Sequence, residues 1–433
     1  MTQLITRRQF TKRSLGIISG SAITATQFPF VQKIKAANDK LNIVAIGTGN
    51  RAGADIAGIA HENLVAVADV DTNFLEQART KYKGARAYQD FRVMLEKEAD
   101  NIDAVVVGSP DHTHAPAAAM AMRLNKHVYC EKPLTHTVHE TRVLMEMAAE
   151  RQLTTQMGTQ IHAGKNYREV VELIRAGAIG KVDKVHVWVN VSLDYSNGSF
   201  GKKAPIPKHL NWDLWLGPAP ERPFSEGIHP FMWRKFWDYG TGRLGDFGCH
   251  YLDLVHWALD LGHPTSVQAS GPKVNKISPP SWLKVEYQHP AAHVTWYGGH
   301  KPKILGELKD TKGQAIDWGS GQLFVGSEGM ILSNYSKHLL LRNGQAVAQI
   351  DRPAASIPRS IGHHREWTEA IRTNGTTTCN FDYAGKLTQA VLLGSVAFQT
   401  GKKLQWDGQH GQITNLPQSE SLLHKEYRAG WTL

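Results

Sequence analysis

The chain has 433 residues, of which 41% are hydrophobic and 20% are charged. This composition is that of a globular protein, and the length is sufficient for two domains that each bury a core. The formal net charge of +10 is concentrated at the start, because residues 1–40 contain seven Lys or Arg and a single acidic residue. The rest of the chain has no basic run with interleaved aromatic residues, which argues against nucleic-acid binding.

Residues 1–39 have the pattern of an export leader. Arg7 and Arg8 lie in the segment Thr6–Lys12, and a short stretch rich in Gly, Ala, Ile and Ser follows. Paired arginines before an apolar segment are typical of the twin-arginine (Tat) pathway, which predicts a periplasmic or cell-envelope protein. The alternative is an exposed basic arm with a chance Arg pair. The apolar stretch is too short and too polar to span a membrane, and it contains no clear cleavage site, so both a cut and a retained leader stay open.

A glycine-rich turn follows the first apolar run of the chain. The run Leu41–Ile46 predicts a strand, the turn begins with Gly47-Thr48-Gly49-Asn50-Arg51-Ala52, and the pattern of residues 54–61 predicts a helix. Strand, glycine turn and helix in this order form the context of a dinucleotide-binding fingerprint, in which pyrophosphate lies on the unpaired N–H groups of the helix N-terminus. The turn therefore predicts that this region binds NAD or NADP.

Asp69 ends the next predicted strand, residues 64–68. A carboxylate at this distance from the glycine turn accepts ribose hydroxyls and repels a 2′-phosphate, which favours NAD and leaves NADP as the alternative. The other interpretation is that Asp69 caps the helix predicted over residues 73–81.

The alternation continues through residues 40–157. Apolar runs at residues 102–107, 127–130 and 153–157 predict strands, and residues 115–124 and 138–150 predict helices, the second opened by a capping box from Thr137 to Glu140. This pattern predicts a doubly wound parallel sheet of the Rossmann type, with ligands at the carboxyl ends of the strands.

Residues 158–433 show another pattern. A helix is predicted over residues 165–176, ended by Gly177, and alternating apolar residues at 185–191, 283–297, 321–333 and 337–350 predict strands without intervening helices. This combination predicts an α+β substrate domain with a large, mainly antiparallel sheet. Because helices cover one face of such a sheet, we expect the other face to join copies of the chain into a homodimer or homotetramer.

A long segment of this domain, residues 193–240, is rich in aromatic side chains. Flat rings next to polar groups suit the CH faces and hydroxyls of a sugar, whereas the alternative is a loop that buries its rings against the core. The residues concerned are Trp212, Trp215, Trp233, Arg234, Trp237 and Tyr239.

The chain resembles the Gfo/Idh/MocA family of oxidoreductases, named after glucose–fructose oxidoreductase, inositol dehydrogenase and rhizopine catabolism. The resemblance covers almost everything after residue 40. It depends on the order and spacing of four short motifs: Gly47–Ala52, Ser109-Pro110-Asp111 with His114, Glu131-Lys132-Pro133, and residues 245–250 with the sequence GDFGCH. The family has more glycine before the acidic residue of the last motif, so Arg243 distinguishes a subgroup.

The resemblance implies hydride exchange between a nicotinamide and a ring carbon of a sugar or cyclitol, with Lys132, Asp246 and His250 as catalytic residues. Together with the motifs it places the cofactor against Gly47, Thr48, Gly49, Asn50, Arg51, Asp69, Ser109, Pro110, Asp111, His114, Glu131, Lys132 and Gln160. The expected substrate contacts are Lys132, His162, Tyr167, Trp233, Arg234, Asp246 and His250.

Elementary chemistry supports the three catalytic candidates. Oxidation of a secondary alcohol requires a base for the hydroxyl proton. A lysine beside a cationic nicotinamide ring has a reason for a lowered pKa, and a histidine can accept or relay a proton. If residues 246–260 are helical, then Asp246, His250, Asp253 and Trp257 lie on one face. The alternatives are an exposed turn lysine, a capping aspartate and a core histidine.

We expect no metal site. Asp246 and His250 have a ligand-like spacing, but neither His162 nor His256 is forced into place as a third ligand. The three cysteines, Cys130, Cys249 and Cys379, are widely spaced and predict neither a disulfide framework nor a CxxC site.

The leading hypothesis is therefore a dehydrogenase for a sugar, sugar derivative or cyclitol. Outside the cytoplasm there is no pool of free NAD, so an exported enzyme would hold its cofactor tightly and recycle it within each turnover. One alternative is a redox-neutral enzyme that cleaves glycosides through a transient keto sugar. A second alternative is a non-catalytic sugar-binding protein with the same fold.

Overall fold

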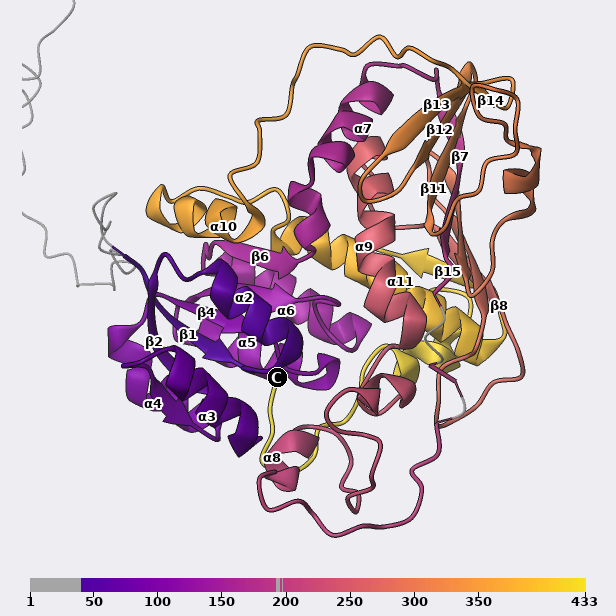
Figure 1. Cartoon of the computed structure of the whole chain (residues 1–433). Coiled ribbons are helices and arrows are strands. Elements are labelled where there is room, and N and C mark those ends of the chain that lie inside the picture. Colours follow the sequence, from indigo (N-terminus) through magenta and orange to yellow (C-terminus); the bar gives the residue numbers. More distant parts are fainter. Residues whose placement is uncertain (1–39, 192–194, 197) are drawn as a thin grey trace, which may run out of the picture. The chain divides into compact units, whose positions relative to one another are not determined.

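The computed structural model describes residues 40–191, 195–196 and 198–433. The predicted export leader lies outside the described residues. Two sheets organise the described part of the chain, and each is formed by a separate set of consecutive strands (Figure 1).

The first sheet is parallel and, among residues 42–158, has six strands in the order β3-β2-β1-β4-β5-β6. This is the strand order of a doubly wound dinucleotide-binding fold, so the predicted Rossmann sheet is confirmed. Its strands are β1 (Asn42–Ile46), β2 (Asn63–Ala68), β3 (Arg86–Tyr88), β4 (Ala104–Val107), β5 (His127–Glu131) and β6 (Thr155–Gly158).

Helices cover both faces of this sheet, because its central strands are apolar on both sides. On one face α2 (Asn50–Gly58) and α3 (Thr72–Lys81) share an apolar cluster with Trp367 of α10 (His363–Arg372), which comes from much later in the chain. The other face carries α4 (Phe91–Glu98), α5 (Asp111–Arg123) and α6 (Val138–Glu150). The predicted capping box of α6 is present, with Thr137 and Glu140 each accepting the other's backbone N–H.

The second sheet has ten strands in the described chain, in the order β14-β13-β12-β11-β7-β10-β9-β8-β15-β16. Its pairs are antiparallel except for β7 with β10, which confirms the predicted, mainly antiparallel sheet. The strands are β7 (Val182–Val189), β8 (Ser266–Ser270), β9 (Leu283–Gln288), β10 (His293–Gly298), β11 (Gly321–Gly326), β12 (Gly329–Ser333), β13 (His338–Arg342), β14 (Gln345–Ala346), β15 (Leu404–Asp407) and β16 (Gln412–Ile413).

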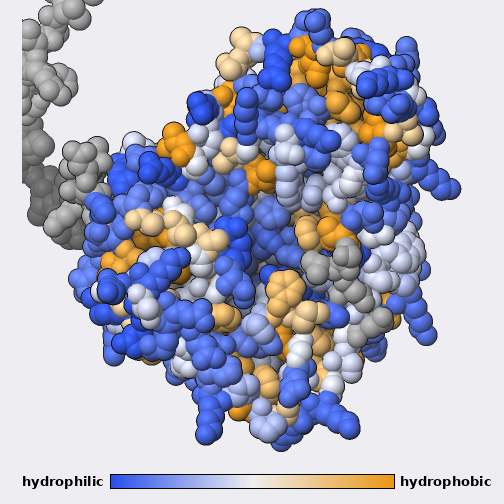
Figure 2. Space-filling view, viewed as in Figure 1, coloured by the Kyte–Doolittle hydropathy of each residue, from blue (hydrophilic) through white to orange (hydrophobic). Residues whose placement is uncertain are grey.

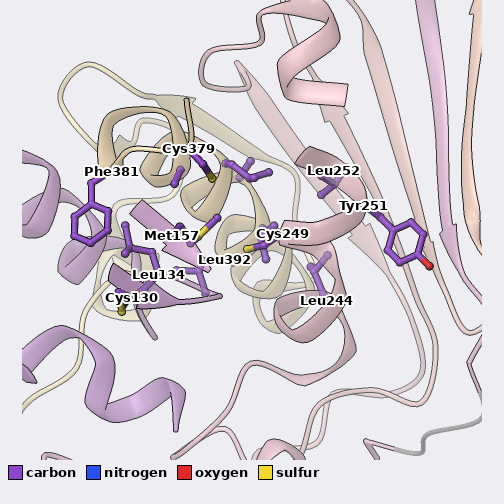
Figure 3. Close-up of a cluster of buried hydrophobic side chains, with 14 of the residues drawn as sticks. Cys130, Leu134, Met157, Leu244, Cys249, Tyr251, Leu252, Cys379, Phe381 and Leu392 are labelled. Atoms are coloured by element: carbon purple, nitrogen blue, oxygen red, sulfur yellow. Dashed lines mark hydrogen bonds between the residues drawn. The ribbon is translucent and has the colours of Figure 1, made fainter. Parts of the chain in front are cut away.

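Three helices pack on one face of the second sheet: α7 (Lys165–Arg175), α9 (Gly242–Leu259) and α11 (Phe381–Thr400). α11 also contacts α6 and β6 of the first domain. Figure 3 shows the result, a buried cluster in which Cys130 and Met157 of the first sheet meet Cys249 of α9 and Leu392 of α11. One continuous core therefore fixes the carboxyl ends of the first sheet against α9.

The opposite face of the second sheet differs from the prediction, because the chain itself covers part of it. Leu305, Leu308 and Trp318 pack on the apolar residues that β11, β12 and β13 present there. The part over β9 is polar, with Lys284 and Glu286 paired at its surface. The expected contact between copies of the chain stays a prediction.

The remaining short elements are α8 (Trp212–Leu216) and the 3₁₀ turns η1 (Ala99–Asn101), η2 (Gln160–Ala163), η3 (Met232–Lys235), η4 (Lys303–Glu307) and η5 (Pro417–Leu422). None of the helices in the described ranges combines the length and hydropathy that a membrane span requires. On the side drawn in Figure 2, hydrophilic residues predominate and apolar ones form small separate groups. All three cysteines are buried and free of disulfides.

Candidate active site

A cleft lies where the carboxyl ends of β1, β2, β4 and β5 face α9 and a long loop segment. We call this segment, residues 209–234, the strap. The cavity volume of the cleft is about 360 Å³, in the range of small-molecule sites. All but one of the expected cofactor contacts line it, the exception being Thr48. The strap contributes Leu214, Trp215, His229, Pro230, Phe231, Trp233 and Arg234.

The glycine turn forms one end of the cleft. Gly47 has φ +86°, and a Cβ there would lie 3.0 Å from the backbone of Gly108. A Cβ on Gly49 would meet the Phe74 ring at 2.9 Å. Helix α2 begins at the next residue, and no side chain caps its free N–H groups. The turn is thus a backbone cradle open to a pyrophosphate, and it fits a dinucleotide.

Asp69 lies beside this cradle at the end of β2. Its Oδ2 accepts hydrogen bonds from the Thr48 N–H (2.8 Å) and hydroxyl (3.0 Å), and its Oδ1 accepts one from the Asp71 N–H (3.0 Å). Thr48 therefore orients Asp69 instead of facing the cleft. The cap of α3 is Asp71, which accepts from the Asn73 N–H, so the interpretation of Asp69 as a helix cap is wrong.

Lys132 forms the other end of the cleft, immediately after β5. Its Nζ lies 2.5 Å from Asp246 Oδ1 and 2.7 Å from the Asp246 backbone oxygen. Burial alone would lower the pKa of Lys132, but the charges of Asp246 and Glu131 outweigh it and raise the pKa above its usual value. With these partners Lys132 is an ammonium donor, and the expected lowering of its pKa by a bound nicotinamide ring stays a prediction.

Asp246 is the acceptor on which several groups converge. Burial would raise its pKa, but Lys132 and Arg234 hold that pKa below its usual range. The Tyr195 hydroxyl donates to Asp246 Oδ2 at 2.5 Å, and Arg234 Nε lies 3.5 Å from Oδ1. Asp246 is thus an anion with both carboxylate oxygens engaged.

His250 lies one turn further along α9 and lines the cleft. Burial, followed by the charge of Lys132, lowers the pKa of His250 to about 3. Its Nδ1 is buried and has no hydrogen-bond partner among the described residues. The ring is therefore neutral at physiological pH, so one of its two nitrogens is a hydrogen-bond acceptor.

Comparison with known proteins agrees with this geometry. Residues 41–159 match the family described as "Oxidoreductase family, NAD-binding Rossmann fold", and residues 163–433 match its "C-terminal alpha/beta domain". The chain belongs to the Gfo/Idh/MocA oxidoreductase family. Its first domain is therefore an NAD-binding Rossmann fold, and the predicted cofactor is confirmed as NAD.

Several proteins of known name are similar to this chain in sequence or in fold. An inositol 2-dehydrogenase from Rubrobacter xylanophilus is 30% identical over 149 residues, which cover 33% of this chain and 42% of that protein. A glycosyl hydrolase family 109 protein from Shewanella pealeana is 27% identical over 33% of this chain and 34% of its own length. The aldose–aldose oxidoreductase of Caulobacter crescentus has the same fold, with a TM-score of 0.58, 18% identity, and coverage of 84% of this chain and 99% of that one.

Three of the expected substrate contacts do not line the cleft: His162, Tyr167 and Asp246, of which Asp246 contacts the lining residues Lys132 and Arg234. His162 is fully buried, with Nδ1 2.9 Å from Asp253 Oδ1 and its ring stacked on Trp257. Tyr167 is also buried, and its hydroxyl donates to the backbone oxygen of His250. The predicted face of α9 is therefore divided: His250 lines the cleft and Asp246 pairs with the lining residue Lys132, whereas Asp253 and Trp257 pack against His162.

The buried pair of His162 and Asp253 has Cys379 as a neighbour, and the potential ligand atoms of the three lie within 4.8 Å of one another. Asp253 already accepts hydrogen bonds from His162 and from the Tyr383 hydroxyl. This network satisfies the buried carboxylate with protein donors, which explains it without a metal ion.

His114 joins two of the family motifs. Its ring nitrogens lie 2.8 Å from the Pro133 oxygen and 2.7 Å from the Ser109 oxygen. Next to it, Asp111 accepts from the Thr241 hydroxyl at 2.8 Å, and burial raises the pKa of Asp111. These contacts hold the loops after β4 and β5 together and connect them to the start of α9.

The sequence did not indicate Tyr195, Phe74 or His229 as members of the site. His229 Nε2 lies 2.8 Å from Asp71 Oδ2, so it fastens the strap to the first domain. Most aromatic side chains of residues 212–239 form a core of their own, with Trp212 stacked on Trp215 and Tyr239 fully buried. This segment therefore buries most of its rings, as the alternative interpretation expected, and it also lines the cleft with Trp233 and Arg234, whereas a contact with a sugar stays a prediction.

Proposed function

We propose that this chain is an NAD-dependent oxidoreductase that acts on a secondary alcohol of a sugar, sugar derivative or cyclitol. The observation that carries the proposal is that Lys132 and His250 line the same cleft as the glycine cradle, with Asp246 bonded to Lys132. The name of the inositol 2-dehydrogenase relative supports the substrate class. When bound, the nicotinamide takes up or returns the hydride of the alcohol carbon.

The residues have distinct roles in this proposal. The Lys132 ammonium donates a hydrogen bond to the substrate oxygen and stabilises negative charge that develops on it. Neutral His250 accepts the hydroxyl proton during oxidation and returns it during reduction. Asp246 keeps Lys132 charged and oriented through the 2.5 Å contact. These assignments keep Lys132, Asp246 and His250 as the catalytic residues.

Removal of Lys132 tests the proposal. We expect Lys132→Ala to lower kcat/KM for sugar oxidation by about 100- to 10,000-fold, the usual contribution of a positioned acid–base group. Bound nucleotide, measured by its absorbance after denaturation of the purified protein, should be retained. Lys165→Ala is the matched control, because the Lys165 side chain is 88% exposed. Normal turnover by Lys132→Ala would overturn the catalytic assignment.

The redox-neutral cleavage of glycosides is the second candidate. The similarity to a glycosyl hydrolase family 109 protein favours it. Incubation with aryl glycosides distinguishes the two candidates. Release of the aglycone without net NADH formation supports cleavage, whereas NADH formation with free sugars supports the dehydrogenase.

We also propose that the leader directs export through the Tat pathway to the periplasm or cell envelope. Arg7 and Arg8 support this proposal, and their joint replacement by Lys should retain the protein in the cytoplasm. The homodimer or homotetramer expected from the second sheet would use the polar surface over β9, and sedimentation measures that state directly.

A further inference from the structure

The strap holds one guanidinium at the reaction end of the cleft. Arg234 lies in η3 with its charged carbon 4.1 Å from the Trp233 ring centre and 4.5 Å from that of Phe231. Its side chain is 19% exposed, and it lines the cleft together with Lys132 and His250. Cation–π contacts with two rings fix the plane and position of the group before any ligand binds.

The N–H groups of Arg234 are largely uncommitted. Among the described residues, its one hydrogen bond runs from Nη1 to the Phe231 backbone oxygen, at 3.2 Å. Asp246 is the nearest anion, but its Oδ1 is bonded to Lys132 and its Oδ2 to Tyr195. The 3.5 Å separation of Arg234 Nε from Asp246 is an electrostatic contact without a hydrogen bond. A guanidinium carries five donors in a fixed fork, so a planar set of donors remains for a ligand.

Charge in this part of the cleft favours an anion. Two cations, Lys132 and Arg234, lie beside the Asp246 carboxylate, and Glu131, which also lines the cleft, is buried, which raises its pKa and opposes its ionisation. The neighbouring Asp111 carboxyl is buried and accepts from Thr241, and its burial opposes ionisation. The glycine cradle that fits the pyrophosphate is formed by other elements, the β1–α2 turn and β2.

We propose that Arg234 binds an oxyanion of the substrate, so that the enzyme acts on an anionic sugar bearing a carboxylate or a phosphate. This inference rests on the proposed function and narrows its substrate class. The oxyanion binds the open side of the guanidinium fork, and the adjoining sugar ring extends from it towards Lys132 and His250. Bidentate pairing of this kind distinguishes arginine from lysine.

Titration calorimetry on the full-length protein with its bound nucleotide tests the proposal. The probes are D-glucuronate and D-glucose 6-phosphate, with D-glucose as the neutral match. We expect at least one anionic probe to bind 10-fold or more tightly than glucose. Arg234→Gln should abolish this preference, and Arg234→Lys should retain only part of it, because lysine keeps the charge and loses the fork. The tighter of the two anionic probes identifies the oxyanion.

Arg222→Gln is the matched control. Arg222 also belongs to the strap, stacks on Phe200 and pairs with Asp238, but it does not line the cleft. The Arg222→Gln variant should keep the wild-type preference for the anionic probe over glucose. Equal binding of neutral and anionic probes by the wild type, no binding of either anionic probe, or an unchanged preference in Arg234→Gln would each overturn the proposal. Calorimetry needs no turnover, so a failure of the proposed oxidoreductase activity would appear separately, as absent NADH formation despite selective binding.

Discussion

At the scale of single residues, the hydrogen bond from the Tyr195 hydroxyl to Asp246 can be removed by deleting a single oxygen atom. The hydroxyl donates to Asp246 Oδ2 at 2.5 Å, and a hydrogen bond to a charged group contributes about 1.5–3 kcal/mol. Without this hydrogen bond, the Asp246 carboxylate is a stronger base, and it attracts the Nζ proton that Lys132 donates to it more strongly. We expect Tyr195→Phe to lower kcat/KM by about 10- to 100-fold while the content of bound nucleotide stays unchanged.

A tyrosine remote from the cleft provides the comparison for this prediction. Tyr297 bonds to His186 in the second sheet and does not line the cleft, so Tyr297→Phe should have wild-type kinetics. If both variants are equally slow, the effect of Tyr195→Phe reflects general destabilisation and the assigned contact is wrong.

Some residues of the site could be predicted from the sequence, whereas the contacts that set their properties could not. Lys132, Asp246 and His250 lie in short motifs that resemble those of the family, and this resemblance indicated all three. The raised pKa of Lys132 depends on Asp246, which is 114 residues away. Tyr195 and His229 likewise acquire their partners through tertiary contacts that no local spacing encodes.

At the scale of elements, the strap lines the cleft near the glycine turn and is attached there to the first domain by hydrogen bonds. The His229 ring bonds to Asp71 at 2.8 Å, and the Thr72 N–H donates to the His209 backbone oxygen at 2.8 Å. We expect His229→Ala to loosen this attachment and to release bound NAD about 10-fold faster, since one such contact contributes about 1.5 kcal/mol. Fluorescence of NADH during dilution into excess NAD measures the release rate.

His209→Ala is the control for this experiment. The His209 ring is 3.8 Å from the same Asp71 oxygen and 40% exposed, so its removal should leave the release rate unchanged. A release rate in His229→Ala equal to that of the wild type would show that the strap does not retain the cofactor.

Elements with local boundary signals could be predicted from the sequence, and elements without them could not. The capping box defined α6 at the predicted residues, Val138–Glu150. In contrast, α2, α5 and α9 begin about one turn before the predicted residues, at Asn50, Asp111 and Gly242. Their first turns carry polar or glycine residues that the apolar pattern does not include. Helix α11 is buried on all sides from Leu387 to Phe398, so the periodicity of this stretch is weak.

At the scale of the whole molecule, the shared core keeps many histidines away from water. Burial is the largest cause of their lowered pKa values, which fall to about 3 for His112, His250 and His256 and to about 4 for His127 and His289. Each of these rings is neutral in the folded protein at a pH where the unfolded chain, with a histidine pKa of about 6.5, binds a proton. The free energy of unfolding should therefore fall as the pH decreases from about 6.5 to about 4, and it should be insensitive to these groups above that window.

His127 allows this prediction to be tested at a single position. Its Nδ1 accepts a hydrogen bond from the Thr154 N–H at 3.0 Å, and the Oδ1 of asparagine can replace that acceptor without titrating. Each histidine contributes about 1.4 kcal/mol per pH unit within the window, so between pH 7 and pH 5 His127→Asn should lose about 2 kcal/mol less stability than the wild type. Urea unfolding at both pH values measures the difference, and His424→Asn, at an exposed position, is the control. The same loss of stability in the wild type and His127→Asn would mean that His127 also binds its proton in the folded state, and that burial of this ring does not make the protein sensitive to acid.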